Sequence, residues 1–236
     1  MHPFNLEGRH IAVTGAGGGI GSEAARIASS LGARVSATDL QEPALEGMTG
    51  SGHTAAALDV SDQTAVEAWV EGLGDFDGLI DCAAICPFSD WEEQGWNQQA
   101  ERVFQINMLG PMNLVRAAMP KLKARGKGSI ALVGSIAGRV GGVRAQPHYA
   151  MSKGGVHALV HWASTRMAPN CNINAVAPGP VDTPMTQGEP YDASGFPMQR
   201  MASAAEIAGP LVFLVSPAAA YINGAVLDIN GALHFS

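Results

Sequence analysis

Tyr149 and Lys153 are the two side chains whose types and spacing best fit proton-transfer chemistry. They lie four residues apart in a stretch with a helical pattern, which places both on one face of a helix. A free tyrosine has a pKa of about 10, too high for a base at neutral pH. An ammonium group about 4 Å away contributes roughly 4 kcal/mol at an effective dielectric constant of about 20. That energy equals about three pKa units, so the spacing predicts a phenol that titrates at about pH 7.

A glycine-rich run, Thr14–Gly21, lies between an expected strand at residues 10–14 and an expected helix at residues 20–31. Glycines there allow a tight turn and a close approach of the backbone to a pyrophosphate. The helix N-terminus then offers free N–H groups and the positive end of the helix dipole. In this position between a strand and a helix, the run predicts a dinucleotide-binding site.

Two acidic residues end the next two expected strands. Asp39 ends the second strand, where an acidic residue accepts hydrogen bonds from the adenosine ribose and repels a 2′-phosphate by about 4 kcal/mol per unit charge. No Arg or Lys follows it, so the sequence favours NAD over NADP as the cofactor. Asp59 is expected to bind the adenine amino group and Val60 to flank the ring. Ser61 and Asp62 also suit the start of the next helix, and both interpretations can hold together.

Apolar runs alternate with helical stretches along the whole chain. Buried parallel strands read as continuous apolar runs, and right-handed crossovers join them into a doubly wound sheet. The prediction is a single α/β domain, residues 1–236, with a seven-stranded parallel sheet, helices on both faces and an irregular substrate loop at about 183–201. The expected strands are 10–14, 34–38, 54–58, 79–83, 129–134, 171–176 and 225–229. The expected helices are 20–31, 62–71, 96–122 with a bend near Gly110-Pro111, 149–167 and 204–214.

Composition excludes several classes of protein. The hydrophobic fraction of 47% is high enough for a large buried core, and the formal net charge of -7 argues against a nucleic-acid partner. Cys82, Cys86 and Cys171 have no zinc or redox spacing, and we expect buried thiols and no metal. The chain shows no signal segment and no run of 18 apolar residues, which predicts a cytoplasmic protein with no membrane contact.

Taken together, these motifs resemble the short-chain dehydrogenase/reductase family in its single-domain form, from Leu6 to Leu233. The resemblance rests on the glycine-rich run, on Asn107 in Ile106–Gly110, on Ser135, on Tyr149–Lys153, on Pro178–Thr183 and on Tyr221–Gly224.

The resemblance implies a role for each of four catalytic residues. Tyr149 would be the general acid/base, and Lys153 would lower its pKa and bind the nicotinamide ribose. Ser135 would polarise the substrate oxygen, and Asn107 would anchor a water of the proton relay. Val181 and Thr183 would bind the nicotinamide carboxamide, and a homotetramer would form through the helices at 96–122 and 149–167. The cofactor would lie along Gly15, Gly18, Gly19, Ile20, Gly21, Asp39, Leu40, Asp59, Val60, Ala83, Ala84, Tyr149, Lys153, Pro178, Gly179, Val181 and Thr183.

Two stretches depart from the family pattern. Where the family usually has Asn-Asn-Ala-Gly after the fourth strand, this chain has Asp81-Cys82-Ala83-Ala84. Ala84 implies a backbone conformation there that tolerates a Cβ atom. Near the C-terminus, Ala232 stands in Asn230-Gly231-Ala232, where a second glycine is commoner.

The expected substrate pocket is mostly apolar, which suits an uncharged aryl or alicyclic secondary alcohol or ketone. Arg144 is the candidate that would bind a substrate carboxylate. An alternative activity is reduction of a 3-oxoacyl thioester on an acyl carrier protein, which Arg139 and Arg144 favour and Asp39 opposes. A catalytically silent NAD-binding regulator is the alternative outside the enzyme class, but it should lack one of the catalytic residues. The residues expected to line the pocket are Ile85, Phe88, Ser135, Gln146, His148 and Met185.

Overall fold

A computed structural model describes residues 4–88, 90–142, 144–189 and 191–235. Seven parallel strands form one sheet, and a second sheet pairs β7 (Val181–Asp182) with β8 (Ala202–Ser203). The spatial order β3-β2-β1-β4-β5-β6-β9 reverses direction between β1 and β4, as in a doubly wound Rossmann-type fold. The fold class therefore agrees with the prediction. The strands of the large sheet are β1 (His10–Thr14), β2 (Arg34–Asp39), β3 (Thr54–Ala57), β4 (Gly78–Asp81), β5 (Gly128–Val133), β6 (Cys171–Pro178) and β9 (Val226–Ile229).

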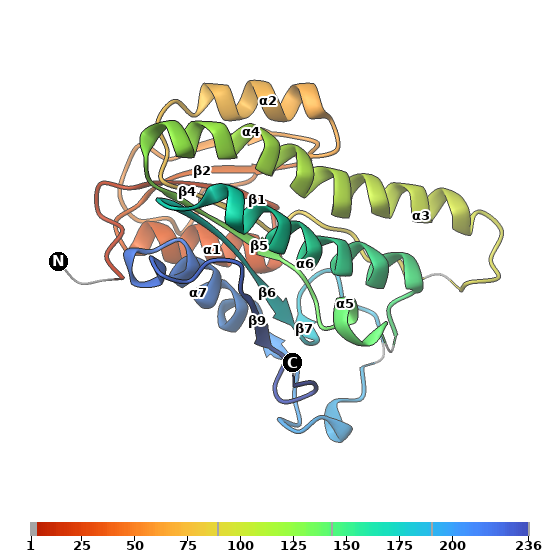
Figure 1. Cartoon of the computed structure of the whole chain (residues 1–236). Helices are drawn as coiled ribbons and strands as arrows, with labels where there is room; N and C mark the ends of the chain where they lie inside the picture. Colours follow the sequence, from red (N-terminus) through yellow and green to blue (C-terminus); the bar gives the residue numbers. More distant parts are fainter. Residues whose placement is uncertain (1–3, 89, 143, 190, 236) are drawn as a thin grey trace.

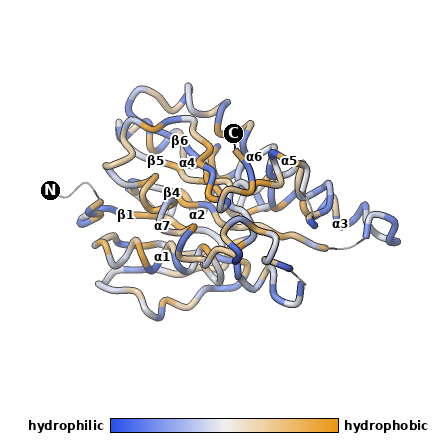
Figure 2. The backbone as a smooth tube through the Cα atoms, turned by 90° about the horizontal axis from the view of Figure 1, so that it is seen from below, coloured by the Kyte–Doolittle hydropathy of each residue, from blue (hydrophilic) through white to orange (hydrophobic). Residues whose placement is uncertain are grey.

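Helices cover both faces of the sheet (Figure 1). On one face lie α1 (Gly19–Ser30) and α7 (Ala204–Leu214), and on the other lie α2 (Gln63–Gly72), α4 (Gly110–Arg125) and α6 (Pro147–Met167). Side chains of successive strand residues point to opposite faces of the sheet. Ile11 and Val13 therefore pack in the core on the side of α1 and α7, while Ala12 packs in the core on the side of α2, α4 and α6. Figure 2 shows hydrophobic residues concentrated along the central strands.

The long helix predicted at 96–122 is divided into three parts. It consists of α3 (Trp96–Phe104), a π-helical turn (Gln105–Leu109) and α4. The interruption lies directly before Gly110-Pro111, where the sequence predicts a bend. Gly110 also allows α4 to approach β3's end closely, because a Cβ atom there would lie 2.8 Å from Val60 Cγ2.

Two other differences from the prediction affect the site. The fourth strand ends at Asp81 rather than residue 83, because the Asp81 carboxylate accepts a hydrogen bond from the Ala83 N–H at 3.1 Å and turns the chain. A short helix that the pattern did not predict, α5 (Ala137–Val140), follows β5. Within the described ranges, no helix has both the length and the apolar character needed to cross a bilayer.

Candidate active site

The carboxyl ends of β1, β2, β4, β5 and β6 meet at one edge of the sheet, and two cavities open there. One has a volume of about 310 Å³ and follows the glycine-rich turn; the other has about 600 Å³ and contains the predicted catalytic residues. Ile20, Ala84 and Thr183 line both cavities, so the two adjoin. This arrangement fits an elongated ligand whose two halves occupy different cavities.

The glycine-rich turn is built from close backbone contacts. Gly15 has a φ of +66°, and a Cβ atom on it would lie 2.6 Å from the Cys82 carbonyl carbon. A Cβ atom on Gly21 would lie 2.0 Å from the Gly15 oxygen, so the first turn of α1 packs directly on the loop. Helix α1 has no side-chain cap and no acidic residue in its first turn. Its free N–H groups and positive dipole end therefore suit a diphosphate.

Asp39 lies beside this turn, on the wall of the smaller cavity. Its carboxylate accepts hydrogen bonds from the Gly17 N–H at 2.9 Å and the Leu40 N–H at 2.7 Å. The carboxylate is thus held in place facing the site where an adenosine ribose would lie.

The end of the smaller cavity where the sequence predicts the adenine contains an arginine that the sequence analysis missed. Arg102 of α3 lines the cavity and pairs with Asp59 at 3.1 Å. The Ser61 hydroxyl and N–H also bond to Asp59, and with Arg102 they hold the pKa of that carboxyl below its usual value. Asp59 is therefore occupied by its own turn, while Asp62 caps α2 through the Ala65 N–H. Val60 also lines the wall of the smaller cavity.

The larger cavity brings together Ser135, from the end of β5, and Tyr149 and Lys153, from α6. Burial raises the pKa of Tyr149 above its ordinary value, and a hydrogen bond with Ser135 offsets only part of this rise. The Lys153 ammonium lies 5.7 Å from the centre of the tyrosine ring and donates a hydrogen bond to the Val133 carbonyl at 2.8 Å. The shift is opposite in direction to the lowering expected from the sequence, and its largest cause is burial of the phenol.

Asn107 lies in the π-helical turn and is buried. Its side chain accepts a hydrogen bond from the Ile85 N–H and donates one to the Ile85 carbonyl, both at 2.9 Å. It also donates to the Ser152 hydroxyl at 3.2 Å. Asn107 thus fixes the segment after β4 to the helix that carries Tyr149. A π-helical turn often marks a functional site.

Three of the six predicted substrate-pocket residues line the larger cavity, namely Phe88, Ser135 and Met185. Ile85 instead lines the smaller cavity. His148 is fully buried and stacks on Trp96 at 5.0 Å between ring centres, and Gln146 is the N-cap of α6. The prediction of His148 as a pocket wall is therefore wrong, because its side chain is fully buried, whereas Ile85 and Gln146 are not among the described residues that line the larger cavity. Further residues on the wall are Cys86, Val140, Arg144, Tyr191, Phe196 and Leu233.

The two arginines that follow Ser135 are both paired with acids. Arg144 lies 3.0 Å from Glu189 of the substrate loop, and its guanidinium lies over the Tyr191 ring at 5.3 Å. Arg139 of α5 lies 2.8 Å from Asp228 of β9 and donates to the Val226 carbonyl at 2.9 Å.

The stretch that departs from the family pattern is well accommodated. Asp81 is buried and accepts hydrogen bonds from the Thr14 hydroxyl at 2.6 Å and the Ala83 N–H. Ala84 does not lie in the left-handed region, so its Cβ is tolerated as expected. Burial raises the pKa of the Cys86 thiol to about 12, which keeps it protonated beside the cavity.

Comparison with known proteins places this site in a family. A family model described as enoyl-(acyl carrier protein) reductase matches residues 15–234. An L-rhamnose 1-dehydrogenase (NAD(P)(+)) from Sphingomonas sp. (strain SKA58) is 33% identical, with 97% of each chain covered. A cis-4-hydroxycyclohexanecarboxylate dehydrogenase from Sinomonas cyclohexanicum is 34% identical over 93% of this chain and 94% of its own.

Solved structures agree with these relatives. A putative 2-deoxy-d-gluconate 3-dehydrogenase from Agrobacterium tumefaciens, with bound NADP, has a TM-score of 0.88 and 29% identity, and the match covers 98% of both chains. Fold and site together define a Rossmann-type enzyme with a nicotinamide cofactor. The chain belongs to the short-chain dehydrogenase/reductase family. It is an NAD(P)-dependent oxidoreductase acting on an alcohol or a ketone.

Proposed function

We propose that the protein transfers a hydride between NAD and an uncharged aryl or alicyclic secondary alcohol or ketone, and that residues 1–236 act as one cofactor-binding and catalytic domain. The observation that carries the proposal is the gathering of Ser135, Tyr149 and Lys153 in one cavity that adjoins the cavity of the glycine-rich turn. The nicotinamide, when bound, supplies or accepts the hydride.

The proton chemistry follows from the positions of the three side chains. Ser135 hydrogen-bonds the substrate oxygen and aligns it with the Tyr149 hydroxyl. Because burial keeps the Tyr149 phenol protonated, it donates its proton to the oxygen as a ketone is reduced. In alcohol oxidation the Lys153 ammonium stabilises the phenolate, and it also binds the nicotinamide ribose. Asn107 holds the Ile85 backbone and anchors a water that relays the proton to solvent.

The proposed cofactor contacts follow the two cavities. Gly15, Gly18, Gly19, Ile20 and Gly21 hold the diphosphate at the N-terminus of α1. The carboxamide of the nicotinamide lies against Val181 and Thr183 in the larger cavity. The remaining proposed contacts are Asp39, Leu40, Asp59, Val60, Ala83 and Ala84 along the adenosine, and Pro178 and Gly179 beside the nicotinamide.

The preference for NAD rests on Asp39. Its carboxylate is fixed beside the ribose position, where a 2′-phosphate would meet a like charge. Arg102, the cation in the same cavity, is already paired with Asp59 and so does not offer a free partner to that phosphate. A relative named for NAD(P)(+) and a neighbour with bound NADP make the cofactor ratio a direct test of this proposal.

The preference for an uncharged substrate rests on the cavity walls. Phe88, Val140 and Phe196 make them apolar, and the guanidinium of Arg144 is neutralised by Glu189. The relative named cis-4-hydroxycyclohexanecarboxylate dehydrogenase supports an alicyclic ring as the substrate skeleton, but the compound in its name carries a carboxylate, so it does not support the absence of charge.

The two alternatives fit the geometry less well. A reductase of carrier-bound 3-oxoacyl thioesters needs free cations near the site to dock its acidic carrier, but Arg139 and Arg144 both pair with acids. A silent regulator should lack part of the catalytic set, and the set is complete.

We further propose a homotetramer in the cytoplasm. Met112, Met151 and Trp162 are exposed large hydrophobic side chains on α4 and α6, and they suit the predicted contact between protomers. All three cysteines are free, which suits a reducing compartment.

A panel of secondary alcohols followed by NADH absorbance tests the catalytic proposal. We expect cyclohexanol and 1-phenylethanol derivatives to have a higher kcat/KM than lactate and 3-hydroxybutyrate, and NAD to have a higher kcat/KM than NADP. Equal values for the two cofactors would contradict the assignment of Asp39. A preference for the hydroxy acids would contradict the substrate class alone.

A further inference from the structure

The larger cavity contains a second tyrosine besides Tyr149. Of the three tyrosines in the chain, Tyr149 and Tyr191 line this cavity, while Tyr221 is fully exposed. Tyr191 belongs to the substrate loop at residues 183–201, and its side chain is partly buried. The proton chemistry proposed above uses Tyr149 but gives no role to Tyr191.

Two contacts and an ion pair hold Tyr191 in place. Its backbone N–H donates a hydrogen bond to the Glu189 carbonyl at 2.9 Å, and the Arg144 guanidinium lies over its ring, 5.3 Å from the ring centre. Arg144 is itself paired with the Glu189 carboxylate at 3.0 Å. A cation over an aromatic face attracts the ring and leaves the phenolic hydroxyl unused. The ring is therefore fixed on the cavity wall while its hydroxyl group stays available.

The Tyr191 phenol lies within electrostatic reach of Tyr149 and Cys86. Burial is the largest cause that raises the pKa of Tyr191, and the Cys86 thiol is the next. The pKa of Tyr149 is likewise raised mainly by burial, with smaller contributions from Cys86 and Tyr191. Because electrostatic interactions weaken with distance, these effects indicate that the two phenols and the thiol lie around a common space. The Tyr191 hydroxyl is protonated at neutral pH, so it can both donate and accept a hydrogen bond there.

The other hydroxyl and charged groups of this wall already have partners or roles. Thr186 donates a hydrogen bond to a backbone carbonyl at 2.7 Å, Asp192 accepts one from a backbone N–H at 2.9 Å, and Arg144 is paired. The catalytic residues and Thr183 have roles in the proposed function. Among the wall residues that the structure describes, Tyr191 thus carries the one hydroxyl with neither a protein partner nor a role.

We propose that Tyr191 determines substrate specificity by hydrogen-bonding a second hydroxyl group on the substrate ring, away from the carbon that exchanges the hydride. The substrate is then a ring-bearing secondary alcohol or ketone with one further uncharged hydroxyl. A polar group in a mostly apolar wall fixes the orientation of a ligand, and a substrate that lacks the matching group leaves that polar group unpaired. The inference rests on the proposed function, because it concerns the substrate of the same site.

Reduction of matched ketones with NADH tests the inference. The substrates are 3- and 4-hydroxycyclohexanone and their methyl analogues, 3- and 4-methylcyclohexanone. A methyl group has nearly the size of a hydroxyl group but cannot form the hydrogen bond. The measured quantity is the kcat/KM of each hydroxy ketone divided by that of its methyl analogue, which we call the hydroxy-to-methyl ratio.

The variant Tyr191→Phe keeps the ring and its contact with Arg144 but removes the hydroxyl group. We expect it to lower the hydroxy-to-methyl ratio about fivefold for at least one ring position, as the loss of one neutral hydrogen bond does. The change should appear in KM, because a contact away from the reacting carbon stabilises the bound substrate and the transition state alike. The matched control is Tyr221→Phe, which removes an exposed hydroxyl and should leave the ratio unchanged. Unchanged NADH binding shows that each variant is folded.

The outcomes separate this inference from the proposed function. If the ketones are reduced but the ratio is the same in Tyr191→Phe and the unmodified enzyme at both ring positions, the inference is overturned and the proposed function stands. A ratio that falls through kcat alone would place Tyr191 in the chemistry and overturn its role in specificity. If none of the four ketones is reduced, the proposed substrate class is contradicted, and this inference with it.

Discussion

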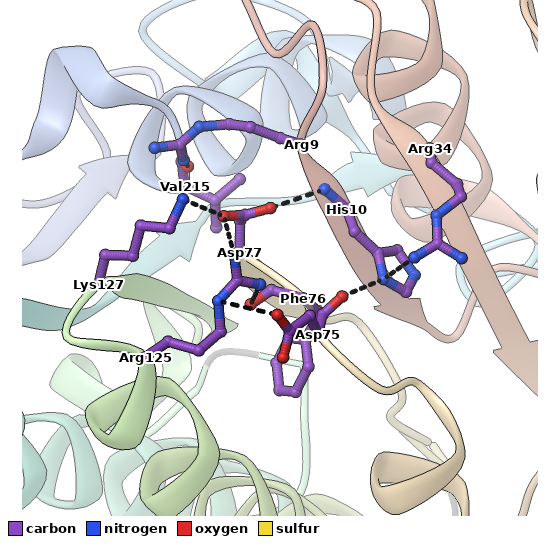
Figure 3. Close-up of polar contacts among 9 residues, drawn as sticks. All are labelled: Arg9, His10, Arg34, Asp75, Phe76, Asp77, Arg125, Lys127 and Val215. Carbon is purple, nitrogen blue, oxygen red and sulfur yellow. Dashed lines mark hydrogen bonds and ion pairs between the residues drawn. The ribbon is translucent and has the colours of Figure 1, made fainter.

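The two edges of the central sheet hold their polar groups in different ways. At the carboxyl edge, the buried Lys153, Asn107 and Asp81 are held by carbonyl, N–H and hydroxyl partners. At the amino edge, Asp77 is held by the His10 N–H and also by the charges of Arg125 and Lys127 (Figure 3). The uncharged partners at the carboxyl edge fix a side chain without neutralising its charge. The ion pairs at the amino edge instead connect the start of β4 to the end of α4. We therefore expect substitutions at the first edge to change chemistry and substitutions at the second to change stability.

The largest expected effect is that of Tyr149→Phe at the carboxyl edge. The change keeps the ring and removes the proton carrier, and a positioned acid/base group contributes about 10²–10⁴-fold to the rate. We expect kcat to fall by at least that factor, while NADH binding and the urea unfolding midpoint stay close to those of the unmodified enzyme. Steady-state kinetics measure kcat, fluorescence titration measures NADH binding, and urea unfolding measures the midpoint. Turnover near normal in the Phe variant would refute the proposed role.

A smaller effect, on stability alone, is expected from Asp77→Asn at the amino edge. Burial by itself would raise the pKa of Asp77, but the His10 N–H, Lys127 and Arg125 outweigh it and lower the pKa. A carboxyl with a lowered pKa stabilises the fold above its unfolded pKa of about 3.9, and this stability is lost as the pH falls through the folded value. We expect a loss of about 1–3 kcal/mol at pH 7 with kcat unchanged.

Urea unfolding of both proteins at several pH values measures this difference. The gap between them should close as the pH falls below about 4. A gap that persists at the lowest pH would show that packing around Asp77, and not its charge, supports the amino edge.

The smallest effect is expected from Glu189→Gln, which leaves Arg144 without its acid at the wall of the larger cavity. A partly exposed pair contributes about 1 kcal/mol, so the kcat/KM for a substrate with a distal carboxylate should rise about fivefold relative to its methyl ester. The double variant Arg144→Gln/Glu189→Gln is the matched control and should lose the gain. An unchanged ratio in the single variant would mean that Arg144 does not reach the substrate.

The order of strands and helices was predictable, because buried parallel strands leave short continuous apolar runs in the sequence, whereas amphipathic helices leave a helical period. The positions of Ser135 and Tyr149 at the carboxyl edge follow from that order. The error over His148 was avoidable, because neighbouring residues on a helix point about 100° apart. If Tyr149 faces the cavity, His148 faces α3.

Other features depend on contacts between distant segments and leave no local pattern. Arg102 meets Asp59, and Arg144 meets Glu189, only because loops bring them together. The π-helical turn around Asn107 has no periodicity of its own. Ala232 adopts a φ of +66°, which costs an L-residue about 1–2 kcal/mol and explains why glycine is commoner there. The residue types near the C-terminus did not by themselves indicate this strain.

The ion pair between Arg139 and Asp228 has a consequence for biosynthesis. The helix directly after Ser135 is fastened to β9, through both the Asp228 carboxylate and the Val226 carbonyl. A polypeptide emerges from the ribosome N-terminus first, so the glycine-rich turn and the strands beside it are synthesised before β9. The helix after the proposed substrate-binding serine acquires these contacts only after residues 226–229 have been translated. A ribosome that stalls before this point therefore leaves a chain that has the glycine-rich turn but lacks the contacts that hold α5, the helix after the proposed catalytic serine, to β9.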